Sequence, residues 1–417
     1  MHRRSTLQLL ASSSLSLTLP PLGLQAAQQR GPERPRSLIV LWMNGGMSQL
    51  ETWDPHPGTP GSGEVSAIPT TVPDLRISSL LPQMAEQMHH CLTIRSLVSE
   101  EGDHERGAAF VRSGFRPEAG LVYPALAAVI SQQQPVPQLD LPPYISLAPA
   151  LSVPEGGYLG SRANAWRVYK PGGQLNNLNA LVQDERLDRR LQGLRFLSER
   201  FHRTRPLAEH RTLHDSMLNQ ALNMMRSEQL QAFELDREPL EVRQRYGDSE
   251  FGTGCLLARR LVETGVRTVE VTLPGFDTHI SNHEGHVTQC RILDPAMSAL
   301  LQDLQERDLL QSTIVLCITE FGRTPSLNPA GGRDHWPHWF SCVVAGGQFR
   351  KGSVIGATQP GIPNDDPSPP QTPISVPELY ATILSQFDID PAAEVSTPIG
   401  RPVRLASAAP NPLLLES

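Results

Sequence analysis

The 417-residue chain has no excess of positive charge, because 36 Lys and Arg stand against 43 Asp and Glu and give a formal net charge of -7. Proteins that bind nucleic acid or anionic lipid usually carry a basic patch or a basic amphipathic stripe, and neither is visible here. The composition therefore argues against a polyanion-binding protein. We expect no nucleic-acid partner.

Cysteine is scarce and irregularly placed. No two of the five cysteines form a C-x-x-C pair, and two of them lie in apolar runs typical of buried strands; the five are Cys91, Cys255, Cys290, Cys317 and Cys342. An odd number without motif spacing argues against a disulfide framework. We expect all five to be small core residues.

The N-terminal region lacks an uninterrupted apolar segment of membrane-spanning length. Residues 7–24 are mildly apolar, but serines and two prolines interrupt them, which argues against a permanent membrane span. The pair Arg3-Arg4 precedes this segment and Ala26 follows it, a pattern typical of a twin-arginine export signal. We interpret residues 1–27 as such a signal, read by the twin-arginine export machinery and leading to the periplasm or cell envelope. A disordered basic end is the alternative interpretation.

Short apolar runs alternate with helical periodicity along the rest of the chain. This alternation is typical of βαβ units and predicts an α/β fold over residues 28–400, with a doubly wound, mostly parallel sheet flanked by helices. The expected strands are 37–43, 91–97, 267–273, 313–319 and 340–345, and the expected helices are 80–88, 106–112, 255–263, 293–307 and 376–387.

Three segments do not follow this rhythm. Residues 124–154 are rich in proline and are expected to form a connection. Residues 178–245 are long, polar and helix-forming, which predicts a helical insertion or lid. Residues 401–417 are expected to be a C-terminal tail.

Polar side chains gather at the ends of the predicted strands. Asn44 starts a Gly-rich turn after the first strand, Asp277 and His279 follow a later one, and Glu320 follows the most apolar one. The segment 332–338, Gly-Arg-Asp-His-Trp-Pro-His, lies just before the last strand. Because ligands bind outside the carboxyl ends of strands in open α/β sheets, this placement predicts a metal or anion site.

Five motifs resemble those of the exported bacterial family called domain of unknown function 1501. They span nearly the whole chain after the signal and are Trp42-Met-Asn-Gly-Gly-Met-Ser-Gln-Leu-Glu-Thr-Trp-Asp-Pro55, Gly102-Asp-His104, Phe276-Asp-Thr-His279, Glu320-Phe-Gly-Arg-Thr-Pro325 and Gly332-Arg-Asp-His-Trp-Pro337. That family is usually placed in the alkaline phosphatase and sulfatase superfamily. The resemblance therefore implies a doubly wound α/β core, a site for one or two metal ions, and hydrolysis of phosphate or sulfate esters.

The resemblance to the superfamily also implies metal ligands. Asn44 stands where a metal-binding Asp is usual, and an amide oxygen is a weaker ligand. Asp277 and His279 resemble the next ligand pair. Glu320 and Phe321 stand in place of an Asp-His pair, so one expected imidazole is missing.

The last ligand implied by the resemblance is His335, supported by Asp334, with His338 as a further candidate for support or substrate contact. Mixed nitrogen and oxygen donors favour zinc, manganese or iron, while magnesium and calcium stay open. The predicted cofactor is thus a divalent metal, with zinc or manganese preferred.

The expected hydroxyl or thiol nucleophile is missing from its place before a helix, where His104 stands. His104 is a candidate nucleophile, general base or ligand, and Ser48 is a second candidate nucleophile. Arg106 and Arg323 are candidates for binding anionic oxygens, because a guanidinium can make bidentate contacts.

Two functions follow from the sequence. The first is an exported, sulfatase-like, metal-dependent hydrolase acting on an anionic ester or a sulfated or phosphorylated glycan. The second is a catalytically silent relative that binds a glycan or an envelope component. In a third, purely structural interpretation, the polar groups form ion pairs that stabilise turns.

Overall fold

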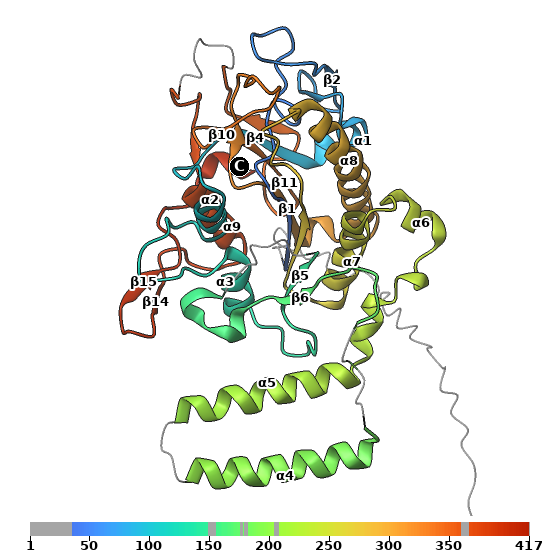
Figure 1. The fold of residues 1–417 in the computed structure, drawn as a ribbon, viewed down its shortest axis with the longest axis vertical. Helices are drawn as coiled ribbons and strands as arrows, with labels where there is room; N and C mark the ends of the chain where they lie inside the picture. Colours follow the sequence, from blue (N-terminus) through green and yellow to red (C-terminus); the bar gives the residue numbers. More distant parts are fainter. Residues whose placement is uncertain are drawn as a thin grey trace, which may run out of the picture. The chain divides into compact units, whose positions relative to one another are not determined.

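The computed structural model describes residues 36–148, 156–175, 178, 182–203, 208–359 and 367–416. The predicted export signal lies outside these residues. In the described part, the central sheet has nine strands in the order β12-β4-β11-β8-β1-β7-β5-β6, with β13 beside β4. Figure 1 shows this sheet in the middle of the α/β body. The strands are β1 (Ser37–Met43), β4 (Cys91–Val98), β5 (Tyr144–Leu147), β6 (Trp166–Val168), β7 (Thr268–Leu273), β8 (Thr313–Ile318), β11 (Phe340–Ala345), β12 (Ser353–Ile355) and β13 (Ile374–Ser375).

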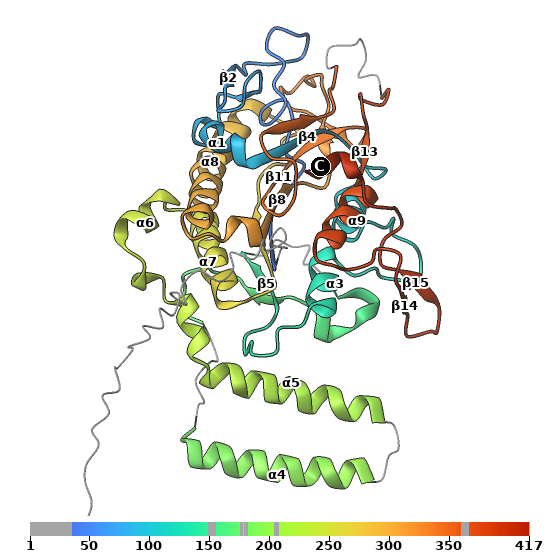
Figure 2. The same ribbon diagram turned by 180° about the vertical axis from the view of Figure 1, so that it is seen from behind.

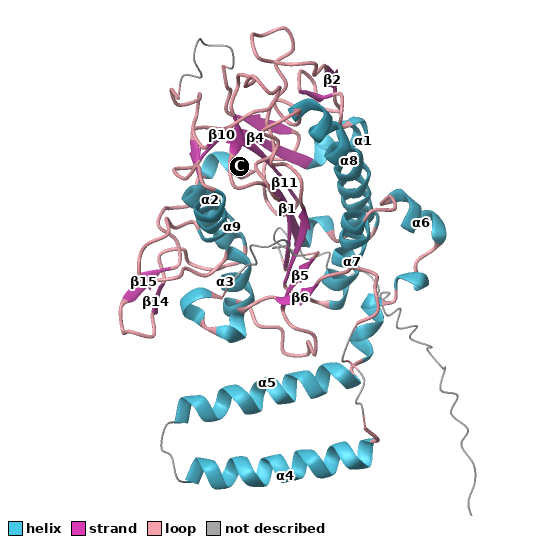
Figure 3. Ribbon diagram, in the orientation of Figure 1, coloured by secondary structure: helices cyan, strands magenta, loops and turns pink. Residues whose placement is uncertain are grey.

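All strand pairs in this sheet are parallel except those of β11, which runs antiparallel to β4 and to β8. The amino end of β11 therefore lies at the same edge as the carboxyl ends of β1, β7 and β8. Segments that follow β1, β7 and β8 thus meet the segment that precedes β11. The sheet is mixed and mostly parallel, which confirms the predicted fold class (Figure 3).

Side chains of β1 alternate between two apolar layers. Ile39 and Leu41 pack in a core with the helices α1 (Pro82–Gln87), α7 (Glu250–Thr264) and α8 (Asn282–Glu306). Leu38 and Trp42 pack on the other face with α2 (His104–Ser113), α3 (Leu126–Gln133) and α9 (Val376–Gln386). A strand that is apolar on both faces must be covered on both, and Figures 1 and 2 show helices on each side of the sheet.

Local sequence signals explain where the helices near the site begin and end. The Asp103 carboxylate caps α2 by accepting a hydrogen bond from the Arg106 amide. Gly265 ends α7 in the left-handed conformation. Helix α8 begins at Asn282, eleven residues before the predicted start at Leu293. The prediction missed its first half because that half is polar and lacks the apolar periodicity that identifies a helix.

The region 124–154, predicted as a connection, contributes α3 and β5. Both are short and bounded by prolines. The prediction missed them because it relied on the proline content of the region. Residues 178–245 include the predicted helices, which are α4 (Asp184–Arg203), α5 (Ala208–Arg226) and α6 (Leu240–Arg245).

The described chain stays packed beyond residue 400. The hairpin of β14 (Glu394–Ser396) and β15 (Pro402–Arg404) is followed by Leu405 and Leu414, both buried in the core that contains α9. Two further small sheets are β2 (Ala67–Pro69) with β3 (Arg76–Ser78), and β9 (Gly322–Arg323) with β10 (His335–Trp336).

All five cysteines are buried and unpaired, as predicted. Across the described residues, no helix has both the length and the apolar character needed to cross a bilayer.

Candidate metal centre

The centre is built around a turn that only glycine fits. Gly45 follows β1 with φ +117°, and a Cβ placed there would lie 2.4 Å from the amide nitrogen of Asp277. This close approach brings the segment after β1 against the segment after β7. It also lets the Gly45 amide donate a 2.8 Å hydrogen bond to Oε1 of Glu320 at the end of β8.

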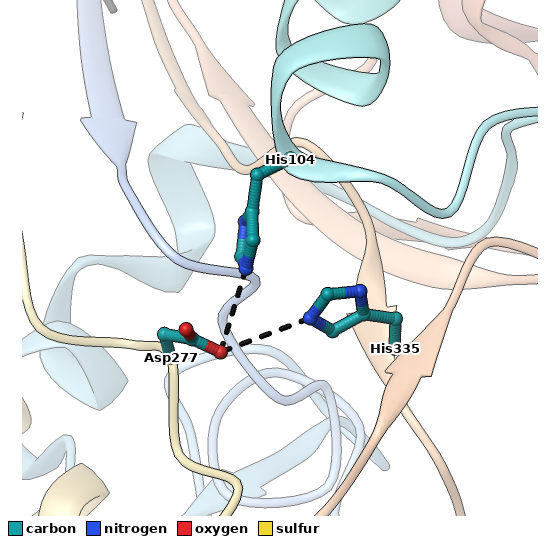
Figure 4. Close-up of side chains that lie close together, drawn as sticks. All are labelled: His104, Asp277 and His335. Atoms are coloured by element: carbon teal, nitrogen blue, oxygen red, sulfur yellow. Dashed lines mark ion pairs between the residues drawn. The ribbon is translucent and has the colours of Figure 1, made fainter. Parts of the chain in front are cut away.

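Four side chains from three segments converge beside this turn. Oδ1 of Asp277 lies 3.4 Å from Nε2 of His104, 3.3 Å from Nε2 of His279 and 3.8 Å from Nε2 of His335. The Nε2 atoms of His279 and His335 are 3.0 Å apart. Figure 4 shows Asp277 between His104, at the start of α2, and His335, on β10.

Each of the three imidazoles is held through its other nitrogen. Nδ1 of His104 lies 2.9 Å from Oε1 of Glu320, and Nδ1 of His279 lies 2.8 Å from Oδ1 of Asp334. Nδ1 of His335 lies 2.7 Å from the carbonyl oxygen of Gly102. Because carboxylates and carbonyls accept, each Nδ1 carries a proton. In its neutral form, each ring would then turn an Nε2 lone pair towards the centre.

This arrangement fits a metal ion. Imidazoles that ligate metals usually donate their other N–H to a carboxylate or a backbone carbonyl. Ligands at about 2.0–2.1 Å from a tetrahedral zinc ion lie about 3.3 Å from one another, and Oδ1 of Asp277 lies 3.3–3.8 Å from the three Nε2 atoms. Among the described residues, His104, Asp277 and His335 form a group whose donor atoms all lie within 4.8 Å of one another. Two Nε2 lone pairs facing each other across 3.0 Å also repel unless a proton or a cation lies between them.

The pKa values of Asp277 and His335 are both lowered, which favours the deprotonated forms that a metal ligand requires. Burial opposes charge on Asp277, but the hydrogen bond and charge of Arg323 outweigh it and lower the pKa of this carboxyl. Burial, together with the nearby charges of Arg323 and His104, lowers the pKa of His335. The hydrogen bond to Glu320 raises the pKa of His104 despite partial burial.

Arg323, predicted to bind substrate, is instead a buried support. Its side chain is 0 % exposed, and its guanidinium donates to the carbonyl oxygens of Gly45, Gly46 and Arg333 and, at 2.6 Å, to Oδ1 of Asp277. Four of its five N–H groups are thus used inside the protein, and the buried guanidinium does not face a substrate. It fixes the turn after β1 and the position of Asp277.

Two predicted metal ligands occupy supporting positions. Both oxygens of Glu320 are used, Oε1 by Gly45 and His104 and Oε2 by Thr319. Asp334 accepts from His279, so it supports that imidazole and not His335, which Gly102 holds. The sequence does not separate these roles, because a carboxylate that binds an imidazole follows the same strand ends as one that binds a metal.

Asn44 lines the cavity beside the centre, but its Oδ1 accepts a 3.2 Å hydrogen bond from the Trp42 indole. Phe321 packs against His104 and His335, with ring centroids 5.0 and 4.4 Å away. It therefore forms an apolar wall where the superfamily resemblance implied an imidazole.

Other sequence candidates lie apart from the converging atoms. Arg106 is half-exposed and makes two 2.8 Å hydrogen bonds to Glu101. The exposed His338 packs edge-on against Trp336. Ser48 is fully buried beside His286, which accepts a hydrogen bond from its amide, so it is not presented to a substrate.

No sequence motif indicated the buried support that lies beneath the centre. Glu51 accepts two hydrogen bonds from Arg333, and Gln49 bonds both the amide and the carbonyl of Arg323. These contacts join the segment after β1 to the hairpin β9–β10 that carries His335. The sequence offered one signal for this support, the polar residues Gln49 and Glu51 shortly after the glycine turn. If such residues are buried, they need hydrogen-bond partners.

A cavity of about 900 Å³ opens beside the centre. His104, Asp277 and Glu320 lie in its wall, and much of the remaining lining comes from α2 and the segment that follows it. This volume lies in the range of small-molecule sites. A ligand in the cavity would contact His104, Asp277 and Glu320 directly.

The family model described as "Protein of unknown function (DUF1501)" matches residues 35–414. A search of curated protein sequences gives no match. The family match thus covers nearly the whole chain, including the central sheet and the candidate metal centre.

Several solved structures are similar at low sequence identity. Ps i-CgsB in complex with k-i-k-neocarrahexaose is 9 % identical with a TM-score of 0.42, covering 86 % of this chain and 73 % of that one. The PsFucS1 sulfatase from Pseudoalteromonas sp. is 10 % identical with a TM-score of 0.37, covering 86 % and 68 %. Alkaline phosphatase from the Antarctic bacterium TAB5 is 10 % identical with a TM-score of 0.37, covering 86 % and 100 %.

Proposed function

We propose that this chain, which belongs to the DUF1501 family, is an exported metal-dependent hydrolase of phosphate or sulfate esters. One observation carries the proposal. Nε2 atoms of His104, His279 and His335 gather around Oδ1 of Asp277, while Glu320, Asp334 and a backbone carbonyl hold the opposite ring nitrogens.

His104, Asp277 and His335 would hold a divalent ion, with His279 beside His335 as a further donor, and the mixed nitrogen and oxygen donors favour zinc or manganese. When bound, such an ion would polarise the ester oxygens and lower the pKa of a water molecule. The structural interpretation, in which the cluster is only a set of ion pairs, does not explain why three imidazole nitrogens gather around one carboxylate oxygen while their other nitrogens are held by acceptors.

The residues of the chain then have distinct tasks. Arg323 holds Asp277 with its oxygen towards the centre, and the rigid turn at Gly45 keeps both in place. Glu320 keeps Nδ1 of His104 protonated, so that Nε2 at the cavity wall is able to ligate a metal or take up a proton. Phe321 excludes water from the side of His104 and His335 that it covers.

Water, and not a side chain, is proposed to attack the ester. Within the described lining of the cavity, the hydroxyl of Ser113 is held by the carbonyl of Ala109 and the amide of Phe115. It is therefore not available as a nucleophile. This proposal replaces the covalent mechanism of the superfamily with direct hydrolysis.

The test is turnover of a panel of aryl phosphates and aryl sulfates by the folded mature protein supplied with zinc or manganese. We expect hydrolysis of at least one class, abolished in His335→Ala and unchanged in His338→Ala. Circular dichroism would establish that all three proteins are folded.

Failure to hydrolyse any ester with any divalent metal, by protein that binds the metal, would overturn the hydrolase proposal. It would favour the catalytically silent relative that binds a glycan or an envelope component.

A further inference from the structure

The cavity beside the metal centre has a chemical character that bears on the substrate. Its polar end holds His104 and Asp277, whereas much of the rest is apolar or aromatic. The apolar part includes Phe115, Pro117, Leu121, Val122, Tyr123 and Ala125. Substrate pockets commonly combine such an apolar body with a few convergent polar groups.

A stacked aromatic pair forms part of the apolar wall. The rings of Phe115 and Tyr123 are nearly parallel, with an interplanar angle of 2° and centroids 4.3 Å apart. The Tyr123 hydroxyl donates a 2.8 Å hydrogen bond to Glu118, which fixes the direction of its ring. A fixed aromatic surface is suited to contact with a planar or apolar group.

The charges around the cavity disfavour a second anionic group. Glu105 and Glu118 lie in the lining in addition to Asp277 and Glu320, and Glu118 is paired with Arg401 at 3.3 Å. The lining arginine, Arg112, pairs with the buried Glu270 at 2.9 Å, so the positive charge of its guanidinium is balanced inside the protein.

We propose that the cavity binds the leaving group of the ester and selects an uncharged aromatic or apolar one, not a polysulfated or polyphosphorylated glycan. This inference rests on the proposed function, because it takes the metal centre as the place of the ester group. The stacked rings of Phe115 and Tyr123 and the acidic side chains of the lining support this inference. A glycan with several sulfates would bring its further anions against Glu105.

The first test measures binding without chemistry. Equilibrium dialysis of 2-naphthol against the full chain should show saturable binding that weakens about tenfold or more in Phe115→Ala. Phe196→Ala is the matched control, because Phe196 is 63 % exposed on α4 and does not line the cavity. If Phe115→Ala does not fold, Phe115→Leu keeps an apolar side chain and removes the aromatic ring.

A charged probe tests the second half of the inference. In His335→Ala, where metal binding should be lost, 6-hydroxynaphthalene-2-sulfonate should bind at least about tenfold more weakly than 2-naphthol, because its sulfonate faces acidic side chains. Equal binding of the two probes would overturn the selection against a second anion.

The two proposals fail differently. Ester turnover without saturable 2-naphthol binding would overturn the leaving-group pocket and leave the hydrolase standing. Binding of 2-naphthol that depends on Phe115, without turnover of any ester, would support the aromatic pocket and overturn the hydrolase.

Discussion

Glu320 and His104 are joined by a 2.9 Å hydrogen bond from Nδ1 of the imidazole to Oε1 of the buried carboxylate. The same oxygen accepts the amide of Gly45, so one carboxylate connects the ends of β1 and β8 to the start of α2. Three segments far apart in sequence are thereby held at fixed distances. The position of His104 is thus a consequence of how the sheet is assembled.

Metal content should depend on the converging side chains and not on a neighbouring histidine. Elemental analysis of purified protein is expected to give about one divalent ion per chain, lost in Asp277→Ala and His335→Ala. His338→Ala is the control, since this exposed imidazole packs against Trp336 and lies apart from the centre. Equal metal content in all four folded proteins would exclude this site.

Asp334 should affect metal affinity without binding the metal. Removing the partner of His279 in Asp334→Ala is expected to weaken metal binding about 10- to 100-fold, because the ring loses its orientation. In Asp334→Asn the amide oxygen still accepts from Nδ1, so much of the affinity should return. Competition with a chromophoric chelator measures both, and an Asn variant no better than Ala would contradict the supporting role.

Arg323→Lys should destabilise the protein by roughly 2–4 kcal/mol, because a lysine cannot supply the fork of donors that a buried guanidinium provides. Denaturant unfolding would measure the loss. The matched control is Arg350→Lys at an exposed position, where the change is expected to stay within about 0.5 kcal/mol. Similar stability of the two variants would disprove the buried support.

The lowered pKa of Glu101 should make the free energy of unfolding depend on pH. Hydrogen bonds from Arg106 and Arg116 lower its pKa from the ordinary value of 4.5 to about 2, against the effect of burial. The unfolded chain therefore binds this proton more readily, so the stabilising contribution is present above pH 4.5 and is lost as the pH falls towards about 2.

Glu101→Gln should reduce the unfolding free energy at pH 7 by about 1–2 kcal/mol and flatten its fall between about pH 5 and 2. Glu100→Gln, at an adjacent side chain that is 61 % exposed and paired with Arg116, should change little. Thermal melts across this pH range provide the measurement. An unchanged acid limb in Glu101→Gln would rule out this assignment.

The apolar pattern of the sequence by itself determined much of the sheet. The strand predicted at Ser37–Met43 has those bounds in the structure, and Cys91, Thr313 and Phe340 begin the strands predicted to start there. Buried strands in such a sheet need continuous apolar runs, which local sequence displays. Where that signal was weak, as in β5 and the first half of α8, the prediction was wrong.

Only the tertiary structure decided the roles of the polar groups. The sequence placed Asp277, Glu320 and Asp334 near one edge, but the direction of each side chain depends on which backbone segments approach it. Gly45 lets the segment after β1 lie against Asp277. This contact depends on the conformation of the turn, which the spacing of residues in the sequence does not reveal. Carboxylates of identical chemistry therefore divide into one that faces the centre and two that hold imidazoles, which no local pattern encodes.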